Sequence, residues 1–307
     1  MPALLTHTYF GEDVLRCLGN AVPVAEARRV FLLGNQGPDP FFYALRTPRL
    51  VRIKEFGSLM HAEKAAESLE AFRCCALGAV EPERDLLMAY LMGFACHFTL
   101  DSVMHPFVYA QQYAVCDAGI EGLDRRDGST VHGQIEADLD MMMLYRRRGE
   151  GIRAHDYTGE VLRASGAALK LLDAAYEALA HEVYGVELPP AAFSRGVRDM
   201  RLTIAVLYSR RGIKRRLLGT VERLFRRHSF AQAMSPRNDV GVTCDFDNRE
   251  RQMWRHPFAD ETSCADFDEL YAQALTEALE NIAVLLGGGP AAEVTGGLNF
   301  EGKALRP

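Results

Sequence analysis

The stretch from Tyr90 to Tyr109, YLMGFACHFTLDSVMHPFVY, constrains the fold of this chain more than any other. It is apolar enough to lie in a protein core, yet His97, Asp101 and His105 carry polar groups at intervals of four residues. On a helix, four residues make about one turn, so these side chains project from one side. Such groups are costly to bury unless they pair with one another or bind a cation. The stretch therefore predicts a buried helix whose polar side chains are paired or coordinated.

Composition and patterning predict a helical globular protein. The 307 residues are 48% hydrophobic and 25% charged, which is the usual balance of a globular chain and enough for one large domain. Strand-like alternation is almost absent, whereas a helical period recurs along the chain. We therefore expect an all-α fold, a compact multi-helix bundle, with a single domain over residues 1–286 and a loosely held tail over 287–307.

Local signals predict where the helices begin and end. Apolar periodicity, glycine and proline punctuation and polar clusters set the boundaries. The predicted helices cover residues 9–21, 25–33, 59–77, 83–100, 130–148, 156–184, 190–208, 213–230 and 266–286. Residues 34–40, 116–129 and 235–263 are predicted to be irregular.

Charge and cysteine usage narrow the class of protein. A net charge of −6 argues against a dedicated nucleic-acid binder, which should be basic. The seven cysteines are odd in number and contain no CxxC motif, which fits a reducing compartment. The opening residues lack a signal-peptide pattern, and the apolar run 86–100 is too short to span a bilayer. These features predict a cytoplasmic protein.

Two short motifs place an imidazole and a carboxylate one helical turn apart. They are His97 and Asp101, continued by His105, and the pair His132 and Glu136. This spacing lets one helix offer two ligands to a metal ion. Zinc suits histidine nitrogen with carboxylate oxygen, whereas calcium prefers all-oxygen shells. A single pair of this kind is more often an ion pair or hydrogen-bonded pair, so spacing alone leaves both interpretations open.

With these motifs included, eight candidate ligand residues occur along the chain. Their types and order resemble those of the zinc-dependent phospholipase C/P1 nuclease family. The resemblance covers about residues 5–140, and the C-terminal half matches only in being helical. The matching positions are His7, Asp39, His61, His97, Asp101, His105, His132 and Glu136. The resemblance implies an all-helical fold that holds a cluster of two or three zinc ions.

The resemblance also implies how the ligands divide among the ions. The first ion would take Asp39, His61, His97 and Asp101. The second ion, with open positions, would take His105, His132 and Glu136, and the third would take His7 with Asp101 as a bridge. The family's amino-terminal tryptophan ligand has no counterpart in Met1-Pro2, so the number of ions is two or three.

The function implied by the resemblance is zinc-dependent hydrolysis of a phosphoester, of the phospholipase C type. Paired zinc ions activate water against a phosphodiester, and Asp39 would orient or deprotonate that water. A phospholipid is one candidate substrate. Pro40 stands where the family has a headgroup-contacting tyrosine, so headgroup preference does not transfer. A P1-type nuclease or nucleotidase, and a non-catalytic helical scaffold stabilised by metal, are the alternatives.

A basic amphipathic segment covers residues 210–228 and is a candidate for peripheral membrane contact. Arginine and lysine side chains alternate there with apolar ones, among them Ile213, Leu217 and Val221. Such a helix can rest on anionic lipid or attract a polyanionic substrate. A solvated basic face is the alternative.

Overall fold

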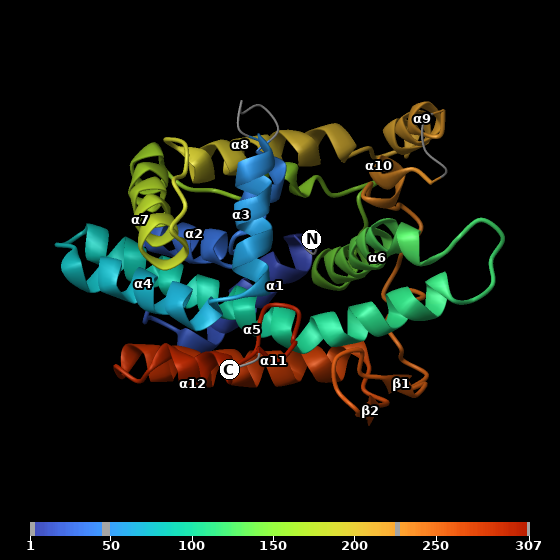
Figure 1. Cartoon of the computed structure of the whole chain (residues 1–307). Helices are drawn as coiled ribbons and strands as arrows, with labels where there is room; N and C mark the ends of the chain where they lie inside the picture. The colour runs from blue at the N-terminus through green and yellow to red at the C-terminus, as the bar shows by residue number, and fades with distance from the viewer. Residues whose placement is uncertain (1–3, 45–49, 225–227, 306–307) are drawn as a thin grey trace. The chain divides into compact units, whose positions relative to one another are not determined.

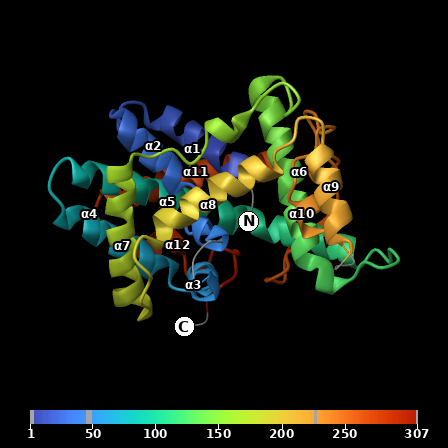
Figure 2. The same cartoon turned by 90° about the horizontal axis from the view of Figure 1, so that it is seen from above.

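The computed structural model describes residues 4–44, 50–224 and 228–305, and the chain is mostly helical (Figures 1 and 2). Helix accounts for 65% and strand for 2% of the residues, as an all-α fold requires. The α-helices of the described residues are α1 (Leu4–Leu18), α2 (Ala25–Gly34), α3 (Leu50–Ala62), α4 (Ala65–Gly78), α5 (Glu83–Cys116), α6 (Gly128–Arg148), α7 (Gly166–Tyr184), α8 (Ala192–Leu207), α9 (Ile213–Glu222), α10 (Phe230–Ala233), α11 (Phe267–Leu286) and α12 (Ala291–Thr295). The shorter elements are the 3₁₀ helices η1 (Asp39–Tyr43), η2 (Arg125–Asp127) and η3 (Tyr157–Gly159) and the antiparallel strands β1 (Trp254–Arg255) and β2 (Thr262–Ser263).

The chain divides into two compact units. Unit 1 comprises the described residues of Met1–Thr6, Met104–Glu160 and Thr203–Tyr271. Unit 2 comprises those of His7–Val103, Val161–Leu202 and Ala272–Pro307. Helix α5 contributes residues to both units. The single domain expected over residues 1–286 stays a prediction.

An aromatic cluster forms the core of unit 2. Tyr176 of α7 stacks on Phe193 of α8 with ring centroids 4.5 Å apart, and Phe41 of η1 meets Tyr176 edge-on at 4.9 Å. The hydroxyls of Tyr90 and Tyr176 lie 2.7 Å apart, and the Tyr176 hydroxyl donates to the Gly37 carbonyl over 3.1 Å. Burial raises the pKa of both tyrosines, so both keep their protons as donors. The core therefore fixes the loop that leads into Asp39.

Helices α2 and α5 pack with their backbones in close contact inside unit 2. A Cβ placed on Gly34 would lie 2.5 Å from the carbonyl oxygen of Tyr90. One placed on Gly93 would overlap the carbonyl oxygen of Phe31. Only glycine allows this approach, because any larger side chain would separate the two helices.

Unit 1 is built around α6 and the irregular segment 235–263. Asp138 of α6 is buried and accepts from Arg237 over 2.9 Å, while Arg237 also pairs with Asp239. The segment pairs β1 with β2, and the ring of Trp254 in β1 lies edge-on to Phe107 of α5, with centroids 5.6 Å apart. The segment predicted to be irregular is thus held in place by an ion-pair network and by aromatic contacts with α5.

Several helix boundaries differ from the prediction for identifiable reasons. The predicted helix 59–77 is divided between α3 and α4, because Lys64 adopts a left-handed φ of 58°. The predicted helix 83–100 continues to Cys116 as α5, even through Pro106. Its extension buries apolar side chains such as Phe107. The helix predicted from residue 156 begins at Gly166, where the Ser165 hydroxyl accepts from the Ala168 amide and caps α7.

The prediction of a loose tail over residues 287–307 is wrong for its described part, 287–305. Residues 291–295 form α12, and Phe300 is completely buried. The Phe300 amide donates to the His61 carbonyl over 3.2 Å, and the Asn299 side chain donates to the Ala62 carbonyl over 3.2 Å. Burial of the Phe300 ring offsets the cost of ordering a segment rich in glycine. Residues 306–307 lie outside the described residues.

Helix α5 is also the one helix of the described chain that is long and apolar enough to cross a bilayer. The apolar run 86–100 is by itself too short to do so, but it lies within a helix of 34 residues. Within its most apolar window, 83% of the residues are buried inside the protein. The core helix of a globular protein meets the same criteria, so this is weak evidence for a span.

The contact between α2 and α5 can be tested with Gly93→Ala. The added methyl group must push the two helices apart, so we expect a loss of about 1–3 kcal/mol in the free energy of unfolding. Denaturant unfolding followed by circular dichroism measures the loss. Gly78→Ala in α4 is the matched control, because its Cβ would meet no other atom within 4 Å. Equal stability of the two variants would contradict the close packing.

Candidate metal centre

The eight predicted ligands fall into three clusters, here called A, B and C. In each cluster the ligand atoms of three residues lie within 4.8 Å of one another. Cluster A is His7, His97 and Asp101; cluster B is Asp39, His61 and His97; cluster C is His105, His132 and Glu136. Clusters A and B share His97 and belong to unit 2, whereas cluster C belongs to unit 1.

Cluster A is organised by the carboxylate of Asp101. Helix α5 presents His97 and Asp101 one turn apart, and α1 brings His7 to them. Asp101 Oδ1 lies 3.0 Å from His7 Nε2, and Asp101 Oδ2 lies 3.3 Å from His97 Nε2. The two oxygens of one carboxylate therefore face two different imidazoles.

His97 is oriented through its second ring nitrogen. Its Nδ1 lies 3.1 Å from the Asn35 carbonyl oxygen, which can only accept, so Nδ1 is assigned the proton. Its Nε2 is buried and makes no hydrogen bond among the described residues. Burial lowers the pKa of His97 to about 4. The ring is therefore neutral near pH 7, which is the form that binds a metal ion.

Cluster B joins the start of η1 to the end of α3. Asp39 begins η1, and Pro40 follows it at a position that suits proline. His61 Nε2 lies 3.2 Å from Asp39 Oδ1, and His61 Nδ1 donates to the Gly57 carbonyl over 2.8 Å. Burial would raise the pKa of Asp39, but the hydrogen bond from His61 and the charges of nearby histidines lower it below its ordinary value. Asp39 is thus an ionised carboxylate held against an oriented imidazole.

Two residues close the space around these imidazoles. Gly37 has a left-handed φ of 47°, and a Cβ on it would overlap the ring of His97. The ring of Phe300 lies 5.1 Å from that of His61 and 5.6 Å from that of His97, centroid to centroid. Gly37 therefore admits the ring of His97, and Phe300 gives both imidazoles an apolar neighbour.

Cluster C joins α5 to α6 within unit 1. Glu136 Oε1 lies 3.3 Å from His132 Nε2 and 3.6 Å from His105 Nε2. The Nδ1 of His132 lies 2.9 Å from Gln112 Oε1, which fixes the orientation of the ring. Burial would raise the pKa of Glu136, but neighbouring positive groups, His132 and His105 among them, hold it well below its usual range. Cluster C thus offers one ionised carboxylate and two imidazoles.

The separations within the clusters are close to those that a shared metal ion would require. Zinc bonds of 2.0–2.2 Å in a tetrahedron place neighbouring ligand atoms about 3.3–3.6 Å apart. An N–H···O hydrogen bond is about 2.7–3.2 Å long. Three of the five imidazole–carboxylate separations, at 3.3, 3.3 and 3.6 Å, fall in the range for zinc ligands. The other two, His61–Asp39 at 3.2 Å and His7–Asp101 at 3.0 Å, have the length of hydrogen bonds. The mixed nitrogen and oxygen donors suit zinc as well.

Each of the eight residues proposed as ligands from the sequence lies in one of the three clusters. The membership of cluster C is the one that the family resemblance implies. The proposed set of Asp39, His61, His97 and Asp101 is divided between clusters B and A, with His97 in both.

Sequence reasoning missed two supporting residues, Gln112 and Phe300. Gln112 follows His105 by seven residues, two helical turns, so their shared face of α5 could have revealed it. Phe300 gave no local signal, because only the fold brings it to His61 and His97.

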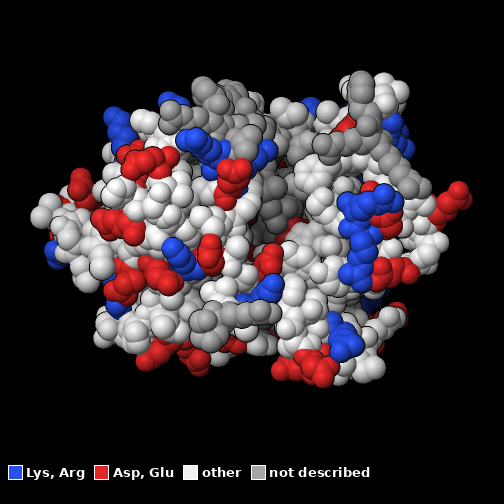
Figure 3. All heavy atoms as spheres, viewed as in Figure 1, with Lys and Arg blue, Asp and Glu red and all other residues white. Residues whose placement is uncertain are grey.

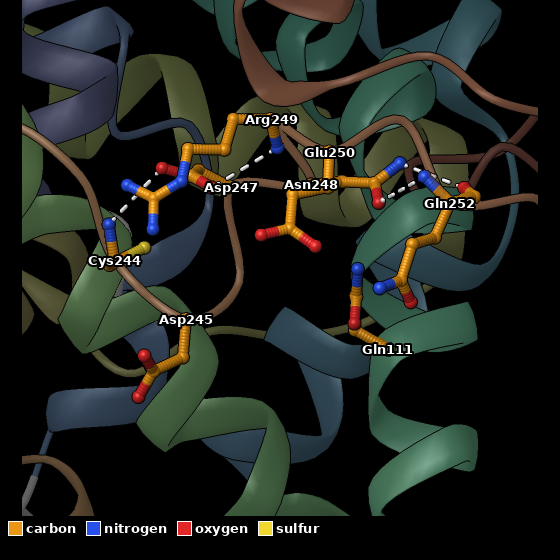
Figure 4. Close-up of a pocket in the computed structure, with 8 residues that line it drawn as sticks. All are labelled: Gln111, Cys244, Asp245, Asp247, Asn248, Arg249, Glu250 and Gln252. Atoms are coloured by element: carbon orange, nitrogen blue, oxygen red, sulfur yellow. Dashed lines mark hydrogen bonds between the residues drawn. The ribbon is translucent and has the colours of Figure 1, made fainter.

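A separate set of residues lines a cavity of about 240 Å³ in unit 1 (Figure 4). The lining residues are Gln111, Cys244, Asp245, Asp247, Asn248, Arg249, Glu250 and Gln252, and none of them belongs to clusters A–C. Asp247 accepts from the amides of Cys244 and Arg249, each over 3.2 Å, and the side chain of Asn248 bonds to the backbone of Gln252. These polar side chains form hydrogen bonds within the loop and so stabilise its conformation. We therefore propose no ligand or reaction for this cavity.

No family model matches this chain, and no curated protein or solved structure is detectably similar to it. The resemblance to the phospholipase C/P1 nuclease family therefore rests on the types and order of the eight ligand residues.

The role of Gln112 can be tested by replacing it with methionine. Gln112→Met keeps the volume of the side chain but removes the acceptor for His132 Nδ1, so we expect zinc affinity at cluster C to fall about 10–100-fold. Competition with a chromophoric chelator measures this affinity. Gln111→Met, one residue earlier on α5, is the control and should leave zinc affinity unchanged. Equal affinities for both variants would contradict the assigned role.

Proposed function

We propose that this protein is a zinc-dependent phosphoester hydrolase of the phospholipase C/P1 nuclease type. The observation that carries the proposal is the carboxylate of Asp101, whose two oxygens face His7 and His97 at 3.0 and 3.3 Å. One residue could thus hold two ions close together, as in a paired-metal site for hydrolysis. The order of the eight ligand types along the chain supports the same assignment.

Zinc held by clusters A and B would acidify a bound water and neutralise charge on the phosphate. The protein's own residues set the conditions for that chemistry. His97 is neutral and oriented by the Asn35 carbonyl, so its Nε2 is available as a ligand. The lowered pKa of Asp39 makes this carboxylate a weak base but a good ligand. Its environment therefore favours orienting a water over removing its proton.

The substrate class follows from the metal chemistry and is a phosphodiester, with a phospholipid as one candidate. A P1-type nuclease or nucleotidase would use the same ligands and is the second candidate. The proposed location is the cytoplasm, which suits seven cysteines that are all free. We propose two or three zinc ions per chain.

Metal content and the role of Asp101 can be tested together. Elemental analysis of the purified protein should find two or three zinc ions per chain, and dialysis against a chelator should remove hydrolysis and lower the melting temperature. Asp101→Asn should lower both zinc content and kcat/KM, the latter by more than the roughly 10–100-fold that losing the hydrogen-bond partner of a metal ligand costs. Asp85→Asn, an exposed position on the same helix, is the control. A protein free of metal at normal stability would refute the proposal.

Catalysis can be separated from a purely structural role of the metal with Glu136→Gln. This variant keeps the shape of the side chain but removes its charge from cluster C. Loss of hydrolysis with an unchanged circular dichroism spectrum supports an enzyme. Loss of the fold, together with an inactive parent protein, supports a scaffold. Diesters of choline, inositol and nucleotides, tested in parallel on the parent protein, separate phospholipase from nuclease activity.

A further inference from the structure

Helix α9 in unit 1 carries a row of exposed apolar side chains. Ile213, Leu217 and Val221 are exposed by 62, 63 and 50%, and Leu224, just beyond the helix, by 76%. Their spacing of four, four and three residues places them on one side of the helix. We call these four residues the α9 strip.

The opposite side of α9 packs against α10 through polar contacts. Arg215 Nε donates to the Gln232 carbonyl over 3.2 Å, and Glu222 Oε2 accepts from the Ala231 amide over 2.8 Å. A Cβ on Gly219 would lie 2.5 Å from Gln232 Oε1, so the two helices are in close contact. A surface helix usually buries its apolar side and exposes its polar one. Helix α9 exposes this apolar row instead, so packing among the described residues does not explain the strip.

Basic side chains flank the α9 strip. On a helical projection Lys214 and Arg216 fall on its two sides, and both are exposed. Residues 210–224 contain six basic side chains and one acidic one, Glu222, whose carboxylate is bonded to α10, whereas the whole chain has a net charge of −6. In Figure 3, uncharged surface with a basic group at its edge lies at the upper right, where Figure 1 places α9. Phe225, Arg226 and Arg227, in the predicted basic segment, lie outside the described residues.

We propose that α9 docks on an anionic lipid surface, with the strip at the boundary of the acyl chains and Lys214 and Arg216 among the headgroups. An exposed apolar row with basic residues on both sides is the pattern of helices that lie in a membrane interface. A second copy of the chain is a poorer occupant, because two such helices would bring like charges together. This proposal does not depend on the proposed hydrolase activity.

Vesicle co-sedimentation of the full chain tests the proposal. The probes are vesicles of phosphatidylcholine alone and vesicles of equal parts phosphatidylcholine and phosphatidylserine. We expect binding to the anionic vesicles only, and weaker binding at high salt, which screens the flanking charges. The same binding is expected for Glu136→Gln, so a failure of the hydrolase proposal would leave this result intact. Absence of binding to anionic vesicles at low salt would overturn the docking proposal.

Variants of α9 show whether the strip itself makes the contact. Leu217→Ser should lower binding about tenfold or more, because burying one leucine side chain is worth at least that factor. Leu77→Ser, at an exposed leucine of α4 (61%), is the matched control. Lys214→Glu combined with Arg216→Glu should weaken binding, whereas Lys170→Glu on α7 should not. Each variant is checked by circular dichroism for an intact fold.

Two outcomes would contradict the assignment of lipid as the occupant. The first is vesicle binding that Leu217→Ser leaves unchanged, which would place the contact elsewhere on the protein. The second is self-association without vesicle binding, measured by sedimentation velocity and lost in Leu217→Ser. That result would assign the strip to a contact between copies of the chain.

Discussion

The candidate site of unit 2 depends on the contacts that the buried carboxylate of Asp101 makes with His7 and His97. Two imidazoles and a carboxylate inside an apolar helix are unfavourable unless each polar atom has a partner or a cation. The partners come from outside α5: the carbonyl of Asn35 orients His97, and α1 supplies His7. The same few contacts therefore stabilise the buried polar groups and orient the side chains of the candidate site.

The loop between α2 and η1 links the candidate site to the aromatic core of unit 2. Its backbone is held by the hydroxyl of Tyr176, and the approach of α2 to α5 is set by glycines at positions 34 and 93. The loop has room for His97 only because position 37 is also glycine. Small changes in these apolar and backbone contacts would move Asp39 relative to His61, so packing remote from the ligands controls the geometry of cluster B.

The two proposals for this protein use different residues but compatible chemistry. The proposed hydrolase would act on a phosphodiester, and an anionic lipid surface is rich in phosphodiesters. The α9 strip would increase the time that the protein spends at such a surface without taking part in hydrolysis. The free energy of surface binding and that of catalysis can therefore be separated by substitution, because the strip lies on α9 and the ligands do not.

The sequence by itself determined the helical class, the ligand types and the amphipathic pattern of α9, because these depend on spacing along one helix. His97 and Asp101, or His132 and Glu136, meet as their four-residue separation predicts. Only the tertiary structure decided which partners come from elsewhere: Gln112 beside His132, and Phe300 beside His61. Tertiary contacts also order residues 287–305, which local composition predicts to be a loose tail. The physical reason is that local spacing fixes which side chains share a face, whereas burial and close packing decide which distant faces meet.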